Sequence, residues 1–285
     1  MTTQFATADV LRVDGRAVAV LESGGDLPRE HSPRPFVHPI RTLSGVVVTD
    51  LAPADHPWHA GLSLAIADID GDNYWGGNTY VAGEGYVLLD DHGHVDPDVP
   101  ERPSEDVCRF DARWLDRRGG VVLHERRTLR AAATEVPGAW RLTADSELTN
   151  VTDRVLGFGS PGTRGRPDAG YGGWTLRLAP RLVGAEVLTS ECGGRPCGED
   201  ALGRPARWVC YRGAGVSVLV ADNAALRGQA APPWYVRVDE FPAVGPAPWF
   251  REVVPLPPGD TLHTGVTVVV ADGLLDPAAV VTSIA

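Results

Sequence analysis

The sequence contains no lysine, so all 26 of its basic side chains are arginines. A guanidinium stays protonated and cannot serve as the amine of a Schiff base or as a lysine-type general base. Catalytic-lysine mechanisms are therefore excluded. Acidic side chains outnumber basic ones and give a formal net charge of −11 at pH 7. Because nucleic acids bind to basic faces, we expect no nucleic-acid partner.

Long hydrophobic runs and cysteines are also scarce. No apolar stretch approaches the roughly 20 residues that a membrane helix needs, and residues 1–8 lack the regions of a signal peptide. We therefore expect a cytoplasmic protein with no membrane partner. The cysteines are expected to be reduced, and the spacing of the middle two does not suit an ordinary zinc knuckle. They are Cys108, Cys192, Cys197 and Cys210.

Several well-known catalytic and nucleotide-binding patterns are missing. The sequence lacks G-x-G-x-x-G, the Walker A pattern and H-E-x-x-H. Residues 157–162 read Gly-Phe-Gly-Ser-Pro-Gly, which is not the G-x-S-x-G of a nucleophile elbow, and no α/β alternation surrounds them. Nucleotide binding and serine-hydrolase chemistry are therefore not supported.

Glycine and proline, by contrast, are plentiful, at 33 and 24 residues. They separate short runs in which apolar and polar residues alternate, as in β-strands. Residues 10–13 and 17–21 flank Asp14-Gly15 and predict a hairpin with a two-residue turn. We predict one all-β domain over residues 1–285, a large antiparallel β-sandwich. Its other strands are expected at 61–69, 107–115, 121–124, 128–133, 140–148, 174–182, 208–211, 216–220, 234–238 and 261–270.

Three segments depart from the strand pattern. Asp276 and Pro277 are typical of a helix start, so we predict a short C-terminal helix over 278–284. Residues 87–106 are acidic and predict a long loop on the rim of the sandwich. Residues 157–173 form a glycine-rich loop that could act as a lid.

Residues 36–75 hold three of the eight histidines and are predicted to build most of the active pocket. Imidazole changes easily between acid, base and metal-ligand roles near neutral pH. In one interpretation, His59 is a general acid or base and His56 or His38 orients the substrate. In the other, these three histidines, with or without His124, bind a divalent metal ion. Both interpretations stay open.

Carboxylates that could complement a catalytic histidine occur in two places. Asp239 and Glu240 follow the predicted strand at 234–238. His124 and Glu125 are adjacent in a strand, so one of them must point inward, where a polar group needs a partner. The catalytic candidates are therefore His59, His38, His56, His124, Glu125, Asp239 and Glu240.

Substrate-binding candidates are an arginine, three aromatic residues and one more histidine. Arg41 could hold a carboxylate or a sugar diol with two hydrogen bonds. Trp58, Tyr74 and Trp75 could pack against the apolar face of a sugar ring. His92 lies in an acidic His-x-His segment that we expect to be solvated, although it stays a candidate.

A resemblance to a known family is carried by the motifs His38-Pro39-x-Arg41-Thr42, Ser44-Gly45, Asp55-His56-Pro57-x-His59-x-Gly61 and Asn73-Tyr74-Trp75. The chain resembles the family labelled methane oxygenase PmoA-like, DUF6807, most clearly in this histidine block and more loosely near residues 171–173, 221–223 and 270–273, so that most of the chain is covered. It departs from the family pattern at Trp58 and Ala60, where His and Arg are common.

This resemblance implies a bacterial all-β protein shaped like the galactose-mutarotase-like supersandwiches and found in carbohydrate utilisation. Such folds generally pair a histidine with a carboxylate for proton transfer at a sugar ring. The methane oxygenase label does not apply literally, since that subunit is embedded in a membrane.

Together, these observations predict an enzyme that acts on a small carbohydrate or another polyhydroxylated or cyclic metabolite. Acid–base chemistry by a histidine and a carboxylate would serve an epimerase, a lyase or a ring-opening enzyme. The alternatives are a metal-dependent enzyme that uses His38, His56 and His59, and a non-catalytic sugar-binding module. We expect a small-molecule substrate and no cofactor, with a divalent metal ion and a homo-oligomer left open.

Overall fold

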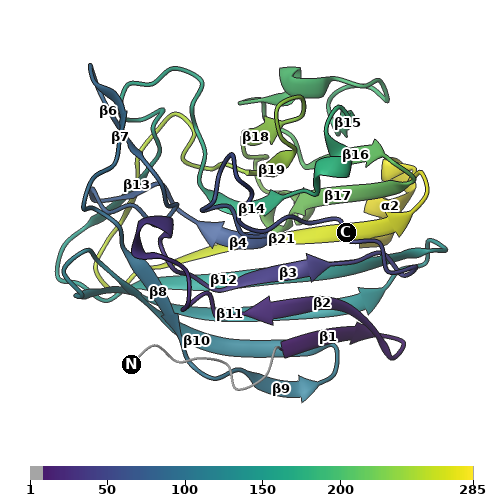
Figure 1. The fold of residues 1–285 in the computed structure, drawn as a ribbon, viewed down its shortest axis with the longest axis horizontal. Coiled ribbons are helices and arrows are strands. Elements are labelled where there is room, and N and C mark those ends of the chain that lie inside the picture. The colour runs from purple at the N-terminus through teal and green to yellow at the C-terminus, as the bar shows by residue number, and fades with distance from the viewer. Residues whose placement is uncertain (1–8, 285) are drawn as a thin grey trace.

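The computed structural model describes residues 9–284 and shows two large antiparallel sheets packed face to face (Figure 1). The seven-stranded sheet runs β1 (Asp9–Val13), β2 (Arg16–Glu22), β3 (Phe36–Ile40), β4 (Leu62–Ala65), β14 (Gly173–Arg177), β19 (Ala243–Pro246) and β18 (Trp234–Arg237). The nine-stranded sheet runs β15 (Glu186–Thr189), β16 (Trp208–Gly213), β17 (Val216–Asp222), β21 (Thr261–Asp272), β12 (Ala139–Asn150), β11 (Val121–Ala133), β10 (Val107–Leu115) and β8 (His94–Pro97), with β9 (Glu101–Ser104) also on β10. The predicted antiparallel β-sandwich is confirmed.

The predicted hairpin and C-terminal helix are also confirmed. Asp14 and Gly15 join β1 to β2 with φ angles of 50° and 75°, the left-handed pair that a two-residue hairpin turn requires. Helix α2 (Pro277–Ile284) begins at the predicted proline. The Oδ1 atom of Asp276 accepts a hydrogen bond from the backbone N–H of Ala278, at 3.0 Å.

Strand β11 joins two segments that the sequence predicted as separate strands. Glu125 and Arg127 interrupt its apolar pattern, yet both side chains point inward and are 2% and 1% exposed. His124 precedes Glu125 in the strand, and its side chain is exposed on the outer face of the sheet. The strand continues through this polar stretch because the two inward charges neutralise each other.

This buried ion pair is fully hydrogen-bonded and lies between the sheets. Arg127 donates from Nε and Nη2 to the Glu125 carboxylate, at 2.7 and 3.0 Å. The same carboxylate accepts hydrogen bonds from Trp114 Nε1 and from the Ser146 hydroxyl. The Arg127 guanidinium packs over the ring of Trp174 in the opposite sheet, 4.9 Å from its centroid. Glu125 therefore stabilises the core.

Several smaller elements extend the sandwich. A three-stranded sheet is formed by β20 (Val254–Leu256), β13 (Leu156–Gly159) and β5 (Asp68–Ile69), and a hairpin by β6 (Thr79–Val81) and β7 (Gly85–Val87). Short helical segments are α1 (Asn223–Leu226), η1 (Arg29–His31), η2 (Pro180–Leu182) and η3 (Gly198–Ala201). The prediction of a loop over residues 87–106 is wrong in part, because this segment contains the strands β8 and β9. Both pair with β10 and cover the edge that this strand would otherwise expose.

All four cysteines were expected to be reduced, and this prediction is wrong for one pair. Cys192 and Cys197 form a disulfide, with their Cα atoms 6.2 Å apart. Gly193 and Gly194 between them adopt left-handed φ angles of 61° and 77°, which turn the chain back on itself. Cys108 and Cys210 are free and buried. No helix within residues 9–284 is long and apolar enough to cross a membrane.

Replacing Glu125 by alanine would leave the Arg127 charge buried without its partner. We expect the free energy of unfolding to fall by about 3–5 kcal/mol, measured by equilibrium denaturation in urea. Glu147→Ala is the matched control: this carboxylate is half exposed on the next strand, and its loss should cost less than about 0.5 kcal/mol. Equal effects of the two substitutions would contradict this assignment.

Candidate functional site

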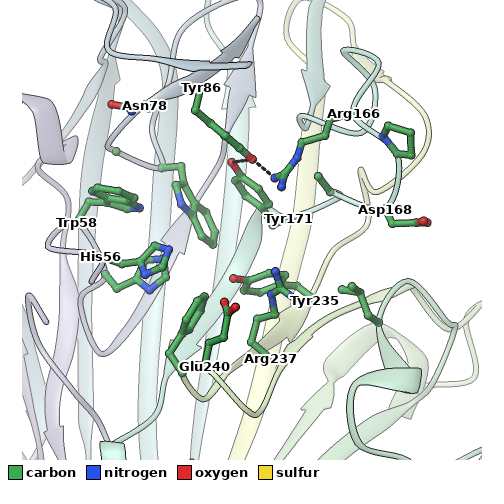
Figure 2. A pocket seen from close by; sticks show the side chains of 17 residues that line it. His56, Trp58, Asn78, Tyr86, Arg166, Asp168, Tyr171, Tyr235, Arg237 and Glu240 are labelled. Carbon is green, nitrogen blue, oxygen red and sulfur yellow. Dashed lines mark hydrogen bonds between the residues drawn. The ribbon is translucent and has the colours of Figure 1, made fainter. Parts of the chain in front are cut away.

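A cavity of about 310 Å³ opens beside β18 and the β6–β7 hairpin (Figure 2). Four separate stretches of chain supply most of its walls: the histidine loop (residues 53–59), the turn after Tyr74, the glycine-rich loop (residues 157–173), and β18 with the turn that follows it. The lining residues are His56, Trp58, His59, Trp75, Gly76, Asn78, Tyr86, Arg166, Pro167, Asp168, Ala169, Tyr171, Leu202, Tyr235, Arg237, Glu240 and Phe241.

Two tight turns in the histidine loop place His56 and His59 together. The backbone N–H of His56 donates to Pro53 O, and that of His59 donates to His56 O. As a result the two imidazoles stack, with their centroids 4.7 Å apart and their planes 14° from parallel. Phe241 covers both rings, at centroid distances of 4.3 and 5.8 Å.

The neighbouring carboxylate of Asp55 orients His56. Its Oδ2 lies 2.9 Å from His56 Nδ1, and since a carboxylate accepts, Nδ1 is the nitrogen that carries the proton. In the neutral ring Nε2 is then a free acceptor. His56 therefore presents a basic nitrogen in the wall of the cavity.

Arg177, at the end of β14, connects Asp55 to His59. Its side chain is 5% exposed, and Nη2 donates to both Asp55 oxygens, at 3.0 and 2.9 Å. Nη1 donates to His59 Nδ1, at 3.3 Å, so in neutral His59 the proton is on Nε2. The guanidinium also lies 4.6 Å from the ring centroid of Phe241. Arg177 was not among the residues expected from sequence, and its only signal there is a charge within a largely apolar strand.

The protonation states of these groups follow from their surroundings. Burial lowers the pKa of His59 well below its ordinary value, and the nearby His56 and Arg177 lower it further. Burial alone would raise the pKa of Asp55, but its hydrogen bonds with His56 and Arg177 outweigh that effect and lower it. Near neutral pH, His59 is therefore neutral and Asp55 is ionised.

The position of Trp58 depends on a buried arginine and a glycine turn. Arg34 is buried, and its Nη2 donates to the Trp58 carbonyl at 2.9 Å. A Cβ atom on Gly77 would lie 2.6 Å from the Trp58 ring, so only glycine fits at this close approach. Asn73 Oδ1 accepts the backbone N–H groups of Trp75 and Gly76 and thereby shapes the same turn.

Aromatic rings form a second wall. Trp75 and Tyr171 lie 4.6 Å apart by their centroids, and Tyr235 lies 6.0 and 5.8 Å from these two rings. Burial raises the pKa of Tyr235 to about 12 and raises the pKa of Tyr171 well above its ordinary value. Both hydroxyls therefore stay protonated near neutral pH.

The predicted glycine-rich loop supplies part of the rim. Its Arg166 donates from Nη1 to the hydroxyl of Tyr86 in the β6–β7 hairpin, and that hydroxyl lies 3.1 Å from the hydroxyl of Tyr171. On a different side of the cavity, Glu240 is exposed and forms no hydrogen bond or ion pair with any described residue (Figure 2). Arg237 pairs with Glu199, at 3.3 Å.

The structure brings together five of the candidates from sequence. His56, His59, Trp58, Trp75 and Glu240 all line the cavity.

Two further candidates, His38 and Arg41, lie outside it. His38 Nδ1 lies 2.9 Å from the Thr49 hydroxyl, and Arg41 donates to the Gly45 carbonyl. Neither residue lines the cavity.

The remaining candidates also lie elsewhere. Tyr74 is buried against Trp114, with ring centroids 5.1 Å apart. His92 was expected to be solvated, and that prediction is wrong: the side chain is buried, with Nε2 2.8 Å from the Gly77 carbonyl. Asp239 is exposed and does not line the cavity. His124 and Glu125 belong to the nine-stranded sheet described above.

The histidines do not converge as a metal site would require. Among residues 9–284, no group of three or more His, Cys, Asp or Glu side chains could hold a metal ion. Nδ1 of His56 is occupied by Asp55, and Nδ1 of His59 by Arg177.

The lowered pKa of His59 predicts a pH-dependent stability. Below pH 6.5, the ordinary pKa of histidine, His59 binds a proton in the unfolded chain but not in the folded chain. The free energy of unfolding therefore decreases as the pH is lowered, by at most about 1.4 kcal/mol per pH unit. His59→Gln should flatten this decline, measured by urea denaturation from about pH 7 to pH 5. The exposed His263→Gln is the control. An unchanged slope in His59→Gln would contradict the assignment.

Comparison with known proteins identifies a family but no function. No curated protein matches the chain. A crystal structure of a candidate aldose 1-epimerase from Escherichia coli K12 is similar, with a TM-score of 0.44 and 13% identity, over 93% of this chain and 99% of that one. A family model described as a family of unknown function, DUF6807, matches residues 9–285. It confirms the DUF6807 part of the resemblance, not the methane oxygenase label. This chain belongs to the DUF6807 family.

Proposed function

We propose that this protein is an enzyme that transfers protons at the ring of a small carbohydrate or a similar polyhydroxylated cyclic metabolite. The observation that carries the proposal is the Asp55–His56 pair, which offers a free imidazole nitrogen in the wall of a cavity. Sequence favoured His59 or His38 for this role. His56 suits it better, because His59 is buried behind it and is bonded to Arg177.

In the proposed mechanism, His56 Nε2 takes a proton from a carbon or hydroxyl of the substrate. The imidazolium that forms is stabilised by Asp55, and Arg177 holds that carboxylate in place. Glu240, in another part of the cavity wall, serves as the complementary acid or base. Such a pair would support epimerisation, elimination or ring opening.

The substrate class follows from the lining of the cavity. Trp75, Tyr171 and Tyr235 offer apolar ring faces, which suit the C–H faces of a sugar ring, beside hydroxyls that can bond to its OH groups. A volume of about 310 Å³ is at the small end of ligand pockets and suits one ring.

A non-catalytic sugar-binding module is the second candidate. The aromatic wall alone would serve such a module. Binding alone, however, does not require a carboxylate that fixes the tautomer of a histidine, so the Asp55–His56 pair favours the enzyme.

His56→Asn should abolish the chemistry and leave the fold intact, because the His56 side chain is 30% exposed and the smaller amide can still donate to Asp55. We would incubate the protein with a panel of aldoses, ketoses and uronates in D₂O and follow deuterium incorporation and new resonances by NMR. The rate should fall by about 100-fold or more. His263→Asn, which changes an exposed histidine on β21, is the matched control. A wild-type rate in His56→Asn, or no chemical change with any compound for the wild type, would overturn the proposal.

A further inference from the structure

Building on the proposed function, we infer that the substrate carries a carboxylate and that Arg166 binds it. The predicted ligand class is therefore a sugar acid with a single ring, such as a uronate. The inference rests on an arginine of the cavity rim that is held in position and has no acidic partner among residues 9–284.

Contacts with Tyr86 fix the Arg166 side chain. Its guanidinium stacks over the Tyr86 ring, 4.7 Å from the centroid, and Nη1 donates to the hydroxyl of the same residue. Nε and Nη2 form no hydrogen bond with any described residue. A guanidinium placed in this way keeps donors free for a ligand, at a low cost in side-chain entropy.

The other arginine in the lining of the cavity, Arg237, is paired with Glu199. Farther from the cavity, Arg177 is paired with Asp55 and Arg164 with Asp68.

Arg166 has no ion pair with a residue in the part of the chain that the structure describes. Asp168, two positions along the chain, points away from the guanidinium, whereas Arg166 extends toward Tyr86 and the cavity (Figure 2). A charge of this kind in a pocket wall would be compensated by an anionic ligand.

A carboxylate suits this site better than a phosphate. The planar fork of an arginine matches the two oxygens of a carboxylate. Phosphate sites commonly add helix N-termini or clusters of backbone N–H groups, and no α-helix within residues 9–284 contributes to the lining of this cavity.

The position of Arg166 also sets how the ligand lies. Arg166 lies apart from His56 and Glu240 in the cavity wall, with Tyr171 in between (Figure 2). The ring of Trp75 lies against that of Tyr171, at a centroid distance of 4.6 Å. A carboxylate on Arg166 would place the sugar ring against these aromatic faces. The ring carbons farthest from the carboxylate would then lie near His56.

The test compares matched acidic and neutral sugars. We would measure ligand-induced shifts in melting temperature with D-glucuronate against D-glucose, and D-galacturonate against D-galactose, at equal ionic strength. At least one uronate should bind about tenfold or more tightly than its neutral partner. Arg166→Gln should remove most of this preference, and Arg166→Lys should restore part of it. Arg118→Gln, which removes an exposed charge from the β10–β11 turn, is the matched control and should behave as wild type.

The outcomes separate this inference from the proposed function. Uronate binding that depends on Arg166, without any chemical change to the sugar, would support the inference and remove the proposed function. Turnover of neutral sugars at the same rate as uronates would support the proposed function and overturn the inference. Equal binding of acidic and neutral sugars, a preference that survives in Arg166→Gln, or tighter binding of glucose 6-phosphate than of either uronate would overturn the inference.

Discussion

The candidate site depends on the buried guanidinium of Arg177. A buried charge must be compensated, and Asp55 in the histidine loop provides the opposite charge. By binding Asp55, Arg177 ties the histidine loop to β14, and through the same carboxylate it determines which nitrogen of His56 is free. Its contact with His59 selects the tautomer of the second imidazole. One strand residue is thus linked to both histidines, to His59 directly and to His56 through Asp55.

Much of the fold could be predicted from sequence because alternation and turn residues act locally. The site could be predicted only where its residues are close in the chain, as with His56, Trp58 and His59. Arg177 and Tyr235 come from distant segments, and only the pairing of β14 with β4 and of β19 with β14 and β18 brings them to the candidate site. No local pattern contains that register.

Sequence also could not separate polar residues of the site from polar residues of the core. Glu125 was correctly expected to require an inward partner if His124 faced out, but that partner is Arg127, within the sandwich. His92 was a candidate for substrate binding and is instead bonded to a backbone carbonyl. Such residues are of the same types as catalytic residues and occur at similar spacings in the sequence. Only the atoms that they contact in the folded protein decide their role.

The hydroxyl contact between Tyr86 and Tyr171 has a consequence for ligand exchange. It joins a hairpin to a loop some 85 positions later in the chain, across the rim of the cavity. A molecule held beneath that bridge could leave only when the two tyrosines separate. Residence time would then depend on how often the bridge breaks.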